Sequence, residues 1–228
     1  MIQIESIEKI SIERNLQNRV FEIIRNYVIR PDVPPGTRLY EEELAKEIGV
    51  SRTPVKIALN KLEHQGLIKI NYNKGAFKVH LSLKEVIEII KIRETLECLS
   101  LEMINDFDPK LIEDLYGSIP HINSFKGPGD VSKYPEFDQQ FHEKMIQMGK
   151  SQWLYTLIKN QDSVFHMLRF IALQDIERIK CSIEEHMNIY NALKANDIPL
   201  AIRYTHDNFR SSIQTLQQKS ANNPGLFR

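Results

Sequence analysis

The sequence predicts a mainly α-helical protein with two parts: an N-terminal winged helix-turn-helix, whose helices carry a small β wing, and a C-terminal all-α bundle of six or seven helices. Three observations lead to this prediction. Two short helical patterns and a hairpin signal follow one another within residues 37–80. From Leu81 onward, apolar residues recur at helical spacing without a strand signal. A chain of 228 residues with 42% hydrophobic residues can fill one or two cores.

The N-terminal part begins with an amphipathic helix. Residues 13–30 place their apolar side chains on one face, and Pro31 ends the helix. After the stiff connector PDVPPG, the segment TRLYE begins as a short strand that can pair with the later hairpin. Arg38, in this strand, is therefore expected close to the hairpin and near the phosphates of any bound DNA.

Two helices follow in the order of a helix-turn-helix. Residues 41–47 form a short helix, Gly49 supplies the tight turn, and Ser51 is placed to cap a second helix that runs to about Gln65. Pro54 stands in the first turn, where its missing N–H costs nothing. The inner stripe of the second helix consists of Val55, Ala58, Leu59 and Leu62.

A hairpin completes this part of the chain. Residues 67–71 and 76–80 form two short strands joined by NYNKG, whose Asn73 and Gly75 tolerate the positive φ of tight turns. In a winged helix, the second helix enters the major groove by its N-terminal end and the wing touches the backbone or minor groove. The bland alternative is that SRTP merely caps an ordinary surface helix.

The charges agree with a DNA-binding function for the N-terminal part. Residues 1–80 hold 13 Lys+Arg and 10 Asp+Glu, whereas the remainder holds 17 and 20, so the two parts carry net charges of +3 and −3. Cationic side chains supply the phosphate contacts that dominate affinity for DNA. The cations expected to face DNA are Arg38, Arg52, Lys56 and Lys74.

The C-terminal part is continuous helix after Ser82, which we expect to cap the first helix. The boundary therefore divides the chain into residues 1–80 and 81–228. The expected helices cover residues 83–105, 109–123, 132–149, 151–173, 175–196 and 198–219.

Four residues of this bundle share the chemistry of a metal site. Asp138 and His142 are four residues apart, hence about one helical turn, so they can grip one cation. His186 and His206 belong to apolar stripes on two further helices, so all four side chains are expected to point into the core. A divalent metal would offset their burial, and these donors suit zinc, nickel or manganese. The alternative is a set of core histidines that are simply hydrogen-bonded.

Three further residues are candidates for contact with a small ligand. Arg93 is a cation on a helix that is apolar nearly all round, and a guanidinium that faces a cavity would pair with a carboxylate. A structural ion pair with Glu97, four residues on, is an equally good interpretation. Arg169 and Asn208 are weaker pocket candidates.

The N-terminal motifs resemble a known family of bacterial transcription regulators, the GntR superfamily. They are PGTRL (35–39), ELA (43–45), SRTPV (51–55), AL..LE..GLI (58–68) and KGAFKV (74–79). The resemblance implies DNA contacts by Arg38, Ser51, Arg52, Thr53 and Gly75. Lys56 departs from the Arg that the family usually has, so it retains phosphate binding but lacks the fork that reads a guanine edge.

A winged helix followed by helices that carry D-x-x-x-H and two later histidines is similar to the FadR-type subfamily with a metal-binding FCD ligand domain. The resemblance covers about Leu16 to Gln217. It implies that Asp138, His142, His186 and His206 are metal ligands, with zinc first and nickel or manganese as alternatives. It also implies that a small organic acid lies beside the metal, and the family's IRE..E pattern assigns Arg93 to that acid.

The remaining features bound the function. Cys98 and Cys181 have no C-x-x-C spacing, and no stretch approaches the ~20 apolar residues of a membrane span, so we expect a cytoplasmic protein without a membrane segment. We expect a homodimer on a palindromic DNA operator, whose affinity a small carboxylate changes. The alternatives are a metal-dependent hydrolase and a metal-free regulator that senses an acyl thioester; the absence of a general base beside the ligands argues against an enzyme.

Overall fold

The computed structural model describes residues 5–30, 32–125 and 131–227, and within them the predicted fold class is confirmed. The chain divides into two compact units. The winged-helix unit comprises residues 1–80 together with 160–164, and the helical unit comprises residues 81–159 and 165–228.

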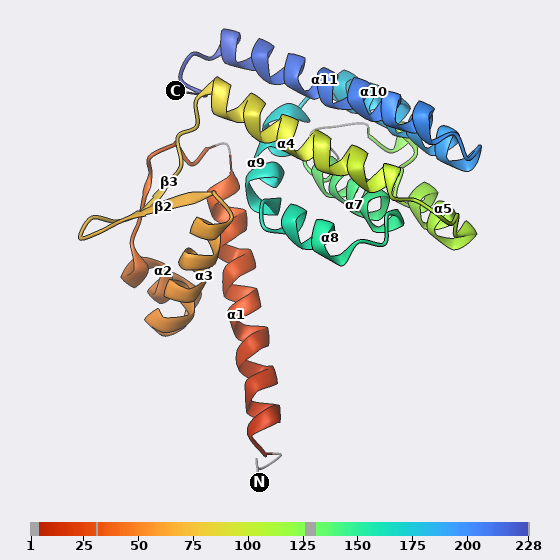
Figure 1. The fold of residues 1–228 in the computed structure, drawn as a ribbon. Helices are drawn as coiled ribbons and strands as arrows, with labels where there is room; N and C mark the ends of the chain where they lie inside the picture. Colours follow the sequence, from red (N-terminus) through yellow and green to blue (C-terminus); the bar gives the residue numbers. More distant parts are fainter. Residues whose placement is uncertain (1–4, 31, 126–130, 228) are drawn as a thin grey trace. The chain divides into compact units, whose positions relative to one another are not determined.

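The winged-helix unit has three helices and a small sheet (Figure 1). Its elements are α1 (Glu5–Ile29), β1 (Arg38–Leu39), α2 (Glu41–Ile48), α3 (Arg52–His64), β2 (Ile68–Asn71) and β3 (Gly75–Lys78). The strands are antiparallel in the order β1-β3-β2, and Arg38 pairs with Phe77. The expected pairing of the first strand with the wing is therefore confirmed, whereas α1 begins eight residues earlier than the sequence pattern predicts.

Local sequence explains how α3 is positioned. Gly49 ends α2 with φ of 76°, and Asn73 and Gly75 turn the wing with φ of 60° and 92°. The predicted inner stripe of α3 is buried, with Leu62 inaccessible to solvent. Ser51 occupies the N-cap of α3 as expected, but its hydroxyl makes no capping hydrogen bond. The exposed face of α3 and the wing are thus held by a closed core.

The helical unit contains no strand among its described residues. Its elements are α4 (Leu83–Glu102), α5 (Pro109–Gly117), the 3-10 helix η1 (Ile122–Ser124), α7 (Tyr134–Met148), α8 (Gln152–Lys159), α9 (Asp162–Ala172), α10 (Ile176–Lys194) and α11 (Ile198–Asn222). Ser82 caps α4 in a capping box with Glu85, as the sequence indicates for Ser82. The single helix expected over 151–173 is wrong: the chain breaks into α8 and α9 at Asn160 and Gln161, where an Asn and the following Asp162 favour helix ends over helix interiors.

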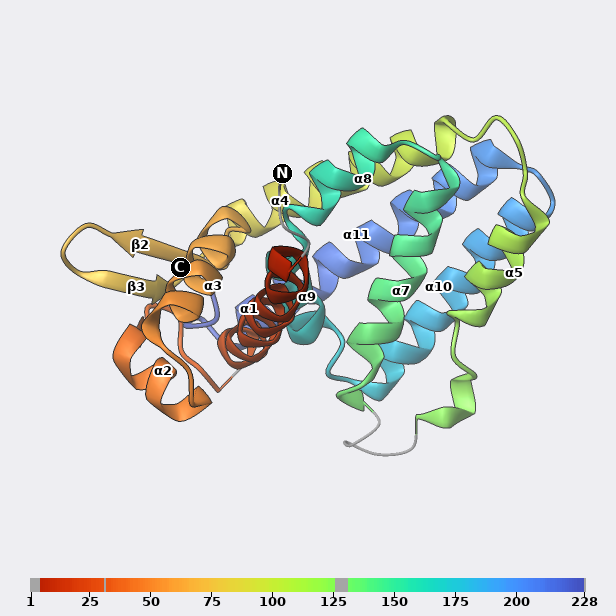
Figure 2. The same cartoon turned by 90° about the horizontal axis from the view of Figure 1, so that it is seen from below.

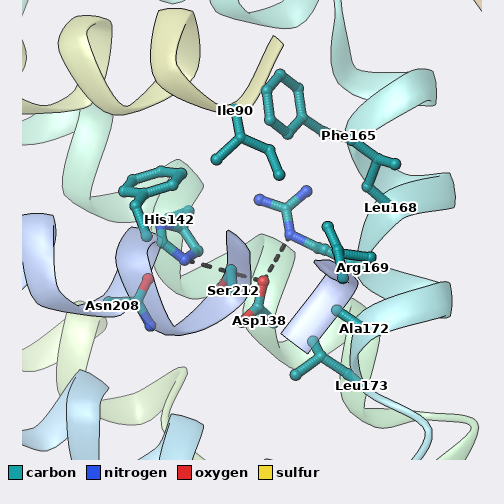
Figure 3. Close-up of a pocket in the computed structure, with 12 residues that line it drawn as sticks. Ile90, Asp138, His142, Phe165, Leu168, Arg169, Ala172, Leu173, Asn208 and Ser212 are labelled. Atoms are coloured by element: carbon teal, nitrogen blue, oxygen red, sulfur yellow. Dashed lines mark hydrogen bonds and ion pairs between the residues drawn. The ribbon is translucent and has the colours of Figure 1, made fainter. Parts of the chain in front are cut away.

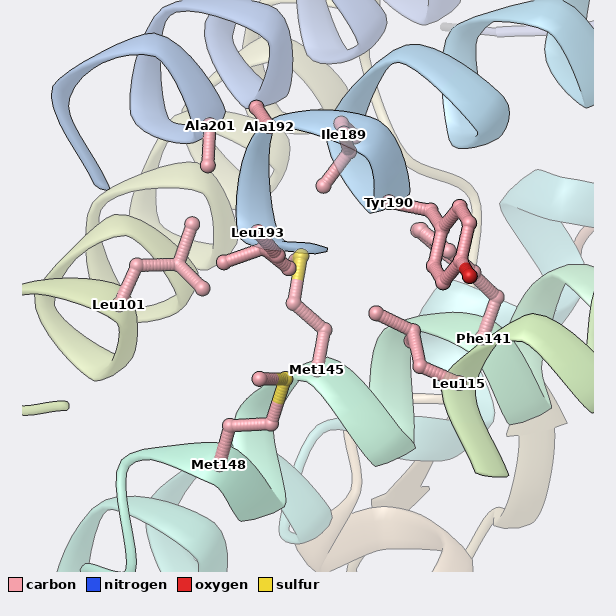
Figure 4. Close-up of a cluster of buried hydrophobic side chains, with 10 residues drawn as sticks. All are labelled: Leu101, Leu115, Phe141, Met145, Met148, Ile189, Tyr190, Ala192, Leu193 and Ala201. Atoms are coloured by element: carbon pink, nitrogen blue, oxygen red, sulfur yellow. The ribbon is translucent and has the colours of Figure 1, made fainter. Parts of the chain in front are cut away.

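The core of the helical unit lies where α4, α5, α7, α10 and α11 meet (Figures 2 and 4). Its buried side chains are Leu101, Leu115, Phe141, Met145, Met148, Ile189, Tyr190, Ala192, Leu193 and Ala201. None of the described helices combines the length and apolarity that a membrane crossing needs. The ring of Phe141 leaves this core to stack on His186 at 4.0 Å between ring centroids, so the apolar core also orients a polar site.

Candidate functional site

The sequence-predicted DNA contacts lie on the surface of the winged-helix unit. Ser51, Arg52, Thr53 and Lys56 are exposed at the N-terminal end of α3. On the wing and its partner strand, Arg38, Lys74 and Gly75 are likewise exposed. One end of a helix and one hairpin thus present cations and hydroxyls to solvent, as DNA binding requires.

Arg38 is held by its neighbours. Its guanidinium carbon lies 4.6 Å from the centre of the Tyr40 ring. A Cβ on Gly75 would lie 3.4 Å from Nε of Arg38, and φ of 92° at Gly75 is strained for any other residue. Gly75 is therefore required for the backbone of the turn, and Arg38 packs against it. Tyr72, 91% exposed at the wing tip, was not singled out by sequence reasoning, because a single Tyr in a turn carries no periodic signal.

Arg52 is engaged by acids of α2. Its Nη1 lies 2.7 Å from Oε1 of Glu42, and its Nη2 lies 3.6 Å from Oε2 of Glu41. All three side chains are at least one-third exposed, so water and salt weaken these pairs. DNA phosphates can therefore compete for Arg52.

In the helical unit, three of the four predicted ligands come together. Ligand atoms of Asp138, His142 and His186 all lie within 4.8 Å of one another, and all three residues are buried. Nε2 of His142 is 3.8 Å from Oδ2 of Asp138, and Nε2 of His186 is 3.4 Å from Oδ1. We call these three residues the triad.

The donors of the triad suit a cation. Nε2 of His186 is buried without a hydrogen-bond partner. Burial, the largest influence, lowers the pKa of His186 to about 3, so the imidazole is neutral and has a lone pair available. Burial raises the pKa of Asp138, but the stronger combined effect of His142, Arg169 and His186 lowers it, which keeps the carboxylate ionised. An imidazole nitrogen without a hydrogen-bond partner, beside a buried carboxylate, forms a set of donors that a divalent metal would bind.

Glu97 orients the triad, a role that sequence reasoning missed. Its Oε2 lies 2.6 Å from Nδ1 of His142, and its Oε1 accepts a hydrogen bond from Nε of Arg93. Although burial raises the pKa of Glu97, His142 and Arg93 lower it to about 2. A carboxylate on Nδ1 fixes the tautomer of a histidine and turns Nε2 toward a metal. The only sequence signal was the spacing of Glu97 from Arg93.

His206 is a correction to the predicted ligand set. Its side chain is 46% exposed, and its Nδ1 lies 2.5 Å from Glu94. The buried face of α11 runs through Thr205, Asn208 and Phe209, and His206 lies about 100° around the helix from Thr205. The sequence stripe was assigned to the wrong side of the helix, and Asn208 is the α11 residue that faces the triad.

A cavity of about 50 Å³ adjoins the triad (Figure 3). Its lining is mostly apolar, with Asp138, His142, Arg169, Asn208 and Ser212 as the polar members. Nε of Arg169 lies 2.6 Å from Oδ2 of Asp138, while its Nη1 is buried without a hydrogen-bond partner. Arg169 and Asn208 thus meet the expectation for pocket residues.

Arg93 does not line this cavity. It is 1% exposed, bonds to Glu97, and its guanidinium carbon lies 4.8 Å from the centre of the Phe165 ring. The structure therefore favours the structural ion pair for Arg93, because its guanidinium bonds to the carboxylate of Glu97, four residues on. The acids that follow His142 and precede His186 in the sequence are also paired: Glu143 with Lys159, and Glu185 with Arg178 and Asn208.

Two family models match the chain. Residues 16–77 match the bacterial regulatory proteins of the gntR family, and residues 88–210 match the FCD domain. The first covers the winged helix, and the second covers the triad and most of the residues that line its cavity.

Individual relatives agree. The HTH-type transcriptional regulator YdhC of Bacillus subtilis is 26% identical over 196 residues, 85% of this chain and 88% of its own. The gluconate operon transcriptional repressor of Bacillus subtilis is 28% identical over 199 residues, 84% of this chain and 81% of its own. The solved structure of E. coli McbR/YncC shares the fold, with a TM-score of 0.76 at 20% identity over 90% of this chain and 98% of that one. The family and the two Bacillus subtilis relatives are transcriptional regulators, not enzymes, and the chain belongs to the GntR family of DNA-binding regulators, with an FCD domain after its winged helix.

Proposed function

We propose that this regulator changes its affinity for DNA when its helical unit binds a divalent metal and a small carboxylate. The observation that carries the proposal is the triad, which holds an orphaned imidazole nitrogen and opens on a cavity that contains an unsatisfied guanidinium N–H. Native interiors rarely leave such groups unpaired. Two orphaned atoms within one site, a donor and an acceptor of opposite chemistry, favour a cation and an anion as the missing partners.

Asp138, His142 and His186 would hold the metal. Glu97 keeps Nε2 of His142 directed at the site, and Phe141 keeps the ring of His186 in place. Two imidazoles and a carboxylate suit zinc, with nickel or manganese as alternatives. A metal at this site would supply positive charge that favours an anionic ligand. His206 lies outside the site and would not contribute to it.

Arg169 and Asn208 would recognise the carboxylate. Arg169 offers a fork of N–H donors, and Asn208 already donates through Nδ2 to Glu185 at 2.8 Å, so its amide is held in one orientation. The cavity of about 50 Å³ favours a small acid over a long acyl thioester, whose chain needs far more volume. The similarity to a gluconate operon repressor supports a carboxylic acid as the signal.

The DNA site is proposed on the exposed end of α3 and the wing. Arg52 and Thr53 would read base edges or phosphates, while Lys56, Lys74 and Arg38 would bind phosphates. One recognition helix covers a half-site, which supports a homodimer on a palindromic operator. The proposed compartment is the bacterial cytoplasm. The metal and carboxylate then act by binding one dimer arrangement better than another.

An apolar face on the helical unit supports the homodimer. Ile92 and Leu99 are exposed along one side of α4, and Met103, its C-cap residue, is exposed four residues further on. On α8, which packs against α4, Trp153 is 86% exposed and Leu157 is 55% exposed. A two-fold dimer needs a surface that is complementary to itself, and apolar side chains meet that need.

DNA binding measured by fluorescence anisotropy tests the proposal. The probe is duplex DNA from upstream of the gene that encodes the chain, with and without zinc and a panel of small carboxylates. We expect a metal-dependent carboxylate to change affinity about tenfold, which corresponds to about 1.4 kcal/mol of coupling. Arg52→Ala should weaken binding by about 1 to 3 kcal/mol, whereas Arg210→Ala, on α11, should not. Affinity that no combination of metal and carboxylate alters would refute the ligand response.

Sedimentation tests the dimer. Leu99→Lys places a charge in the apolar face and should yield monomers, whereas Tyr116→Lys, also exposed but on α5, should leave the dimer intact. Equal sedimentation of both variants and the unaltered protein would assign the dimer interface elsewhere.

A further inference from the structure

Arg169 lies next to the triad and bonds to Asp138, the carboxylate that an added cation would also bind. Its Nε lies 2.6 Å from Oδ2 of Asp138, and Nε2 of His142 lies 3.8 Å from the same oxygen. The other oxygen, Oδ1, is 3.4 Å from both His186 Nε2 and Ser182 Oγ. In this structure the guanidinium is thus the permanent positive charge in direct contact with Asp138.

The charges around the triad balance without a metal. Arg169 pairs with Asp138, Arg93 with Glu97, and Arg178 with Glu185. Two positive charges added among the triad would therefore face a buried guanidinium that shares the same carboxylate. Like charges at such short range repel strongly where water is scarce. Either the guanidinium must leave Asp138, or an anion must enter beside it.

The cavity gives the guanidinium a place to go. Figure 3 shows it between Asp138 and the side chains of Ile90 and Phe165, at the edge of the cavity. Its Nη1 already has no hydrogen-bond partner, so one donor is available before any movement. The cavity lining offers Ser212 as a further polar group. A small carboxylate that enters there would replace Asp138 as the bidentate partner of Arg169.

We propose that Arg169 exchanges partners: it holds Asp138 in the metal-free protein, and when a metal binds the triad it turns to the carboxylate of the ligand. Metal and carboxylate therefore bind cooperatively, because each offsets the charge that the other introduces. This inference rests on the proposed function and adds a mutual dependence of two affinities. The site binds the acid tightly only when it holds the metal, and it binds the metal tightly only when the acid is present.

Calorimetric titration of the full chain with zinc, with and without saturating acetate, tests the exchange. In the unaltered protein, acetate should tighten zinc binding by about tenfold, within the usual range of coupling between sites. In Arg169→Gln the competing cation is gone, so zinc should bind without acetate at least as tightly as in the unaltered protein, and acetate should change that affinity less than twofold. Arg178→Gln, which removes another guanidinium near the triad that does not line the cavity, should keep the acetate effect.

Arg169→Lys serves if the Gln variant does not fold. It keeps the positive charge and loses the fork, so zinc should bind as in the unaltered protein while acetate has a smaller effect. Zinc binding that acetate leaves unchanged in the unaltered protein, or an acetate effect that survives in Arg169→Gln, would overturn the exchange and leave the metal site standing. A protein that binds no zinc in either buffer would overturn the metal site and the exchange together.

Discussion

Two buried cations, one in each unit, differ in how fully the surrounding protein atoms satisfy their hydrogen-bond donors. Lys78 of the winged-helix unit is 5% exposed, and its ammonium donates to the carbonyls of Arg30 and Val33 at 3.0 and 2.9 Å. Arg169 of the helical unit has one bond to Asp138 and an Nη1 without a partner. The ammonium of Lys78 joins β3 to the end of α1, whereas the guanidinium of Arg169 ends in a cavity.

The difference separates a structural charge from a binding charge. A buried donor that protein atoms satisfy contributes to stability and has no capacity for another partner. A buried donor that protein atoms leave unsatisfied destabilises the fold, and where it also borders a cavity, as Arg169 does, a bound ligand can satisfy it. Binding should therefore stabilise the helical unit and leave the winged-helix unit unchanged.

The largest effect should come from Glu97, at the centre of the buried charges of the helical unit. Glu97→Gln removes the carboxylate that pairs with both Arg93 and His142, so it should lower the free energy of unfolding by about 3 to 5 kcal/mol in metal-free protein. Urea denaturation with a chelator present measures this. Glu113→Gln, on the exposed side of α5, is the matched control and should be neutral. Equal effects would mean that the Glu97 network contributes little.

Lys78 should matter less, and independently of ligands. Lys78→Met removes the donor to two buried carbonyls, which should lower the free energy of unfolding of the winged-helix unit by about 1 to 3 kcal/mol. Zinc should not restore this loss. Lys69→Met, on the exposed side of β2, is the control. If zinc restored the stability of Lys78→Met, the contrast between Lys78 and Arg169 would be wrong, because a cation that protein atoms satisfy would then be coupled to the ligand site.

The stability of the winged-helix unit should depend on pH through Lys78. Burial lowers the pKa of Lys78 from an ordinary value of 10.5 to about 8. Between these values the unfolded chain binds more protons than the folded one, so the free energy of unfolding should rise with pH, by about 2 to 3 kcal/mol from pH 8 to pH 10.5. Thermal melting across this window measures the rise. In Lys78→Met the rise should be absent; its persistence would assign the effect to another group.

The smallest effect is expected at the DNA-facing surface. Glu42→Gln releases Arg52 from an exposed ion pair worth about 0.2 to 1 kcal/mol and removes a negative charge, so DNA affinity should increase about twofold to fivefold. Anisotropy at one fixed salt concentration measures it. Glu88→Gln, on α4 of the helical unit, should not change affinity; a weaker complex with Glu42→Gln would mean that the acid orients Arg52 for DNA.

The winged helix was predictable because each step is local. Gly49, Ser51 and Pro54 define the turn and the start of α3 from neighbouring residues, and Asn73 and Gly75 define the wing in the same way. The site in the helical unit depends instead on how helices face one another. Periodicity identified Asp138, His142 and His186 correctly as core residues. It placed His206 on the wrong side of α11, because Ile202 and Ile213 form an apolar stripe that is only half buried.

The sequence also could not predict which ion-pair partners the buried arginines have. Spacing allowed Arg93 to pair with Glu97 or with a ligand, and only the fold decides, since it brings His142 to the other oxygen of the same carboxylate. Arg169 seemed the weaker candidate because nothing local links α9 to Asp138, 31 residues away. The break between α8 and α9 lacks Gly or Pro, so no strong sequence signal announced it.

Hydrogen exchange of the full chain, with and without zinc and acetate, compares the two units in one sample. We expect zinc with acetate to slow amide exchange in α7, α9 and α10, which carry the triad and Arg169, and to leave α3 and the β2–β3 hairpin unchanged in the absence of DNA. Exchange that remains the same in α7 and α10, or that slows first around Lys78, would contradict the claim that the unsatisfied charges of the helical unit mark the ligand site.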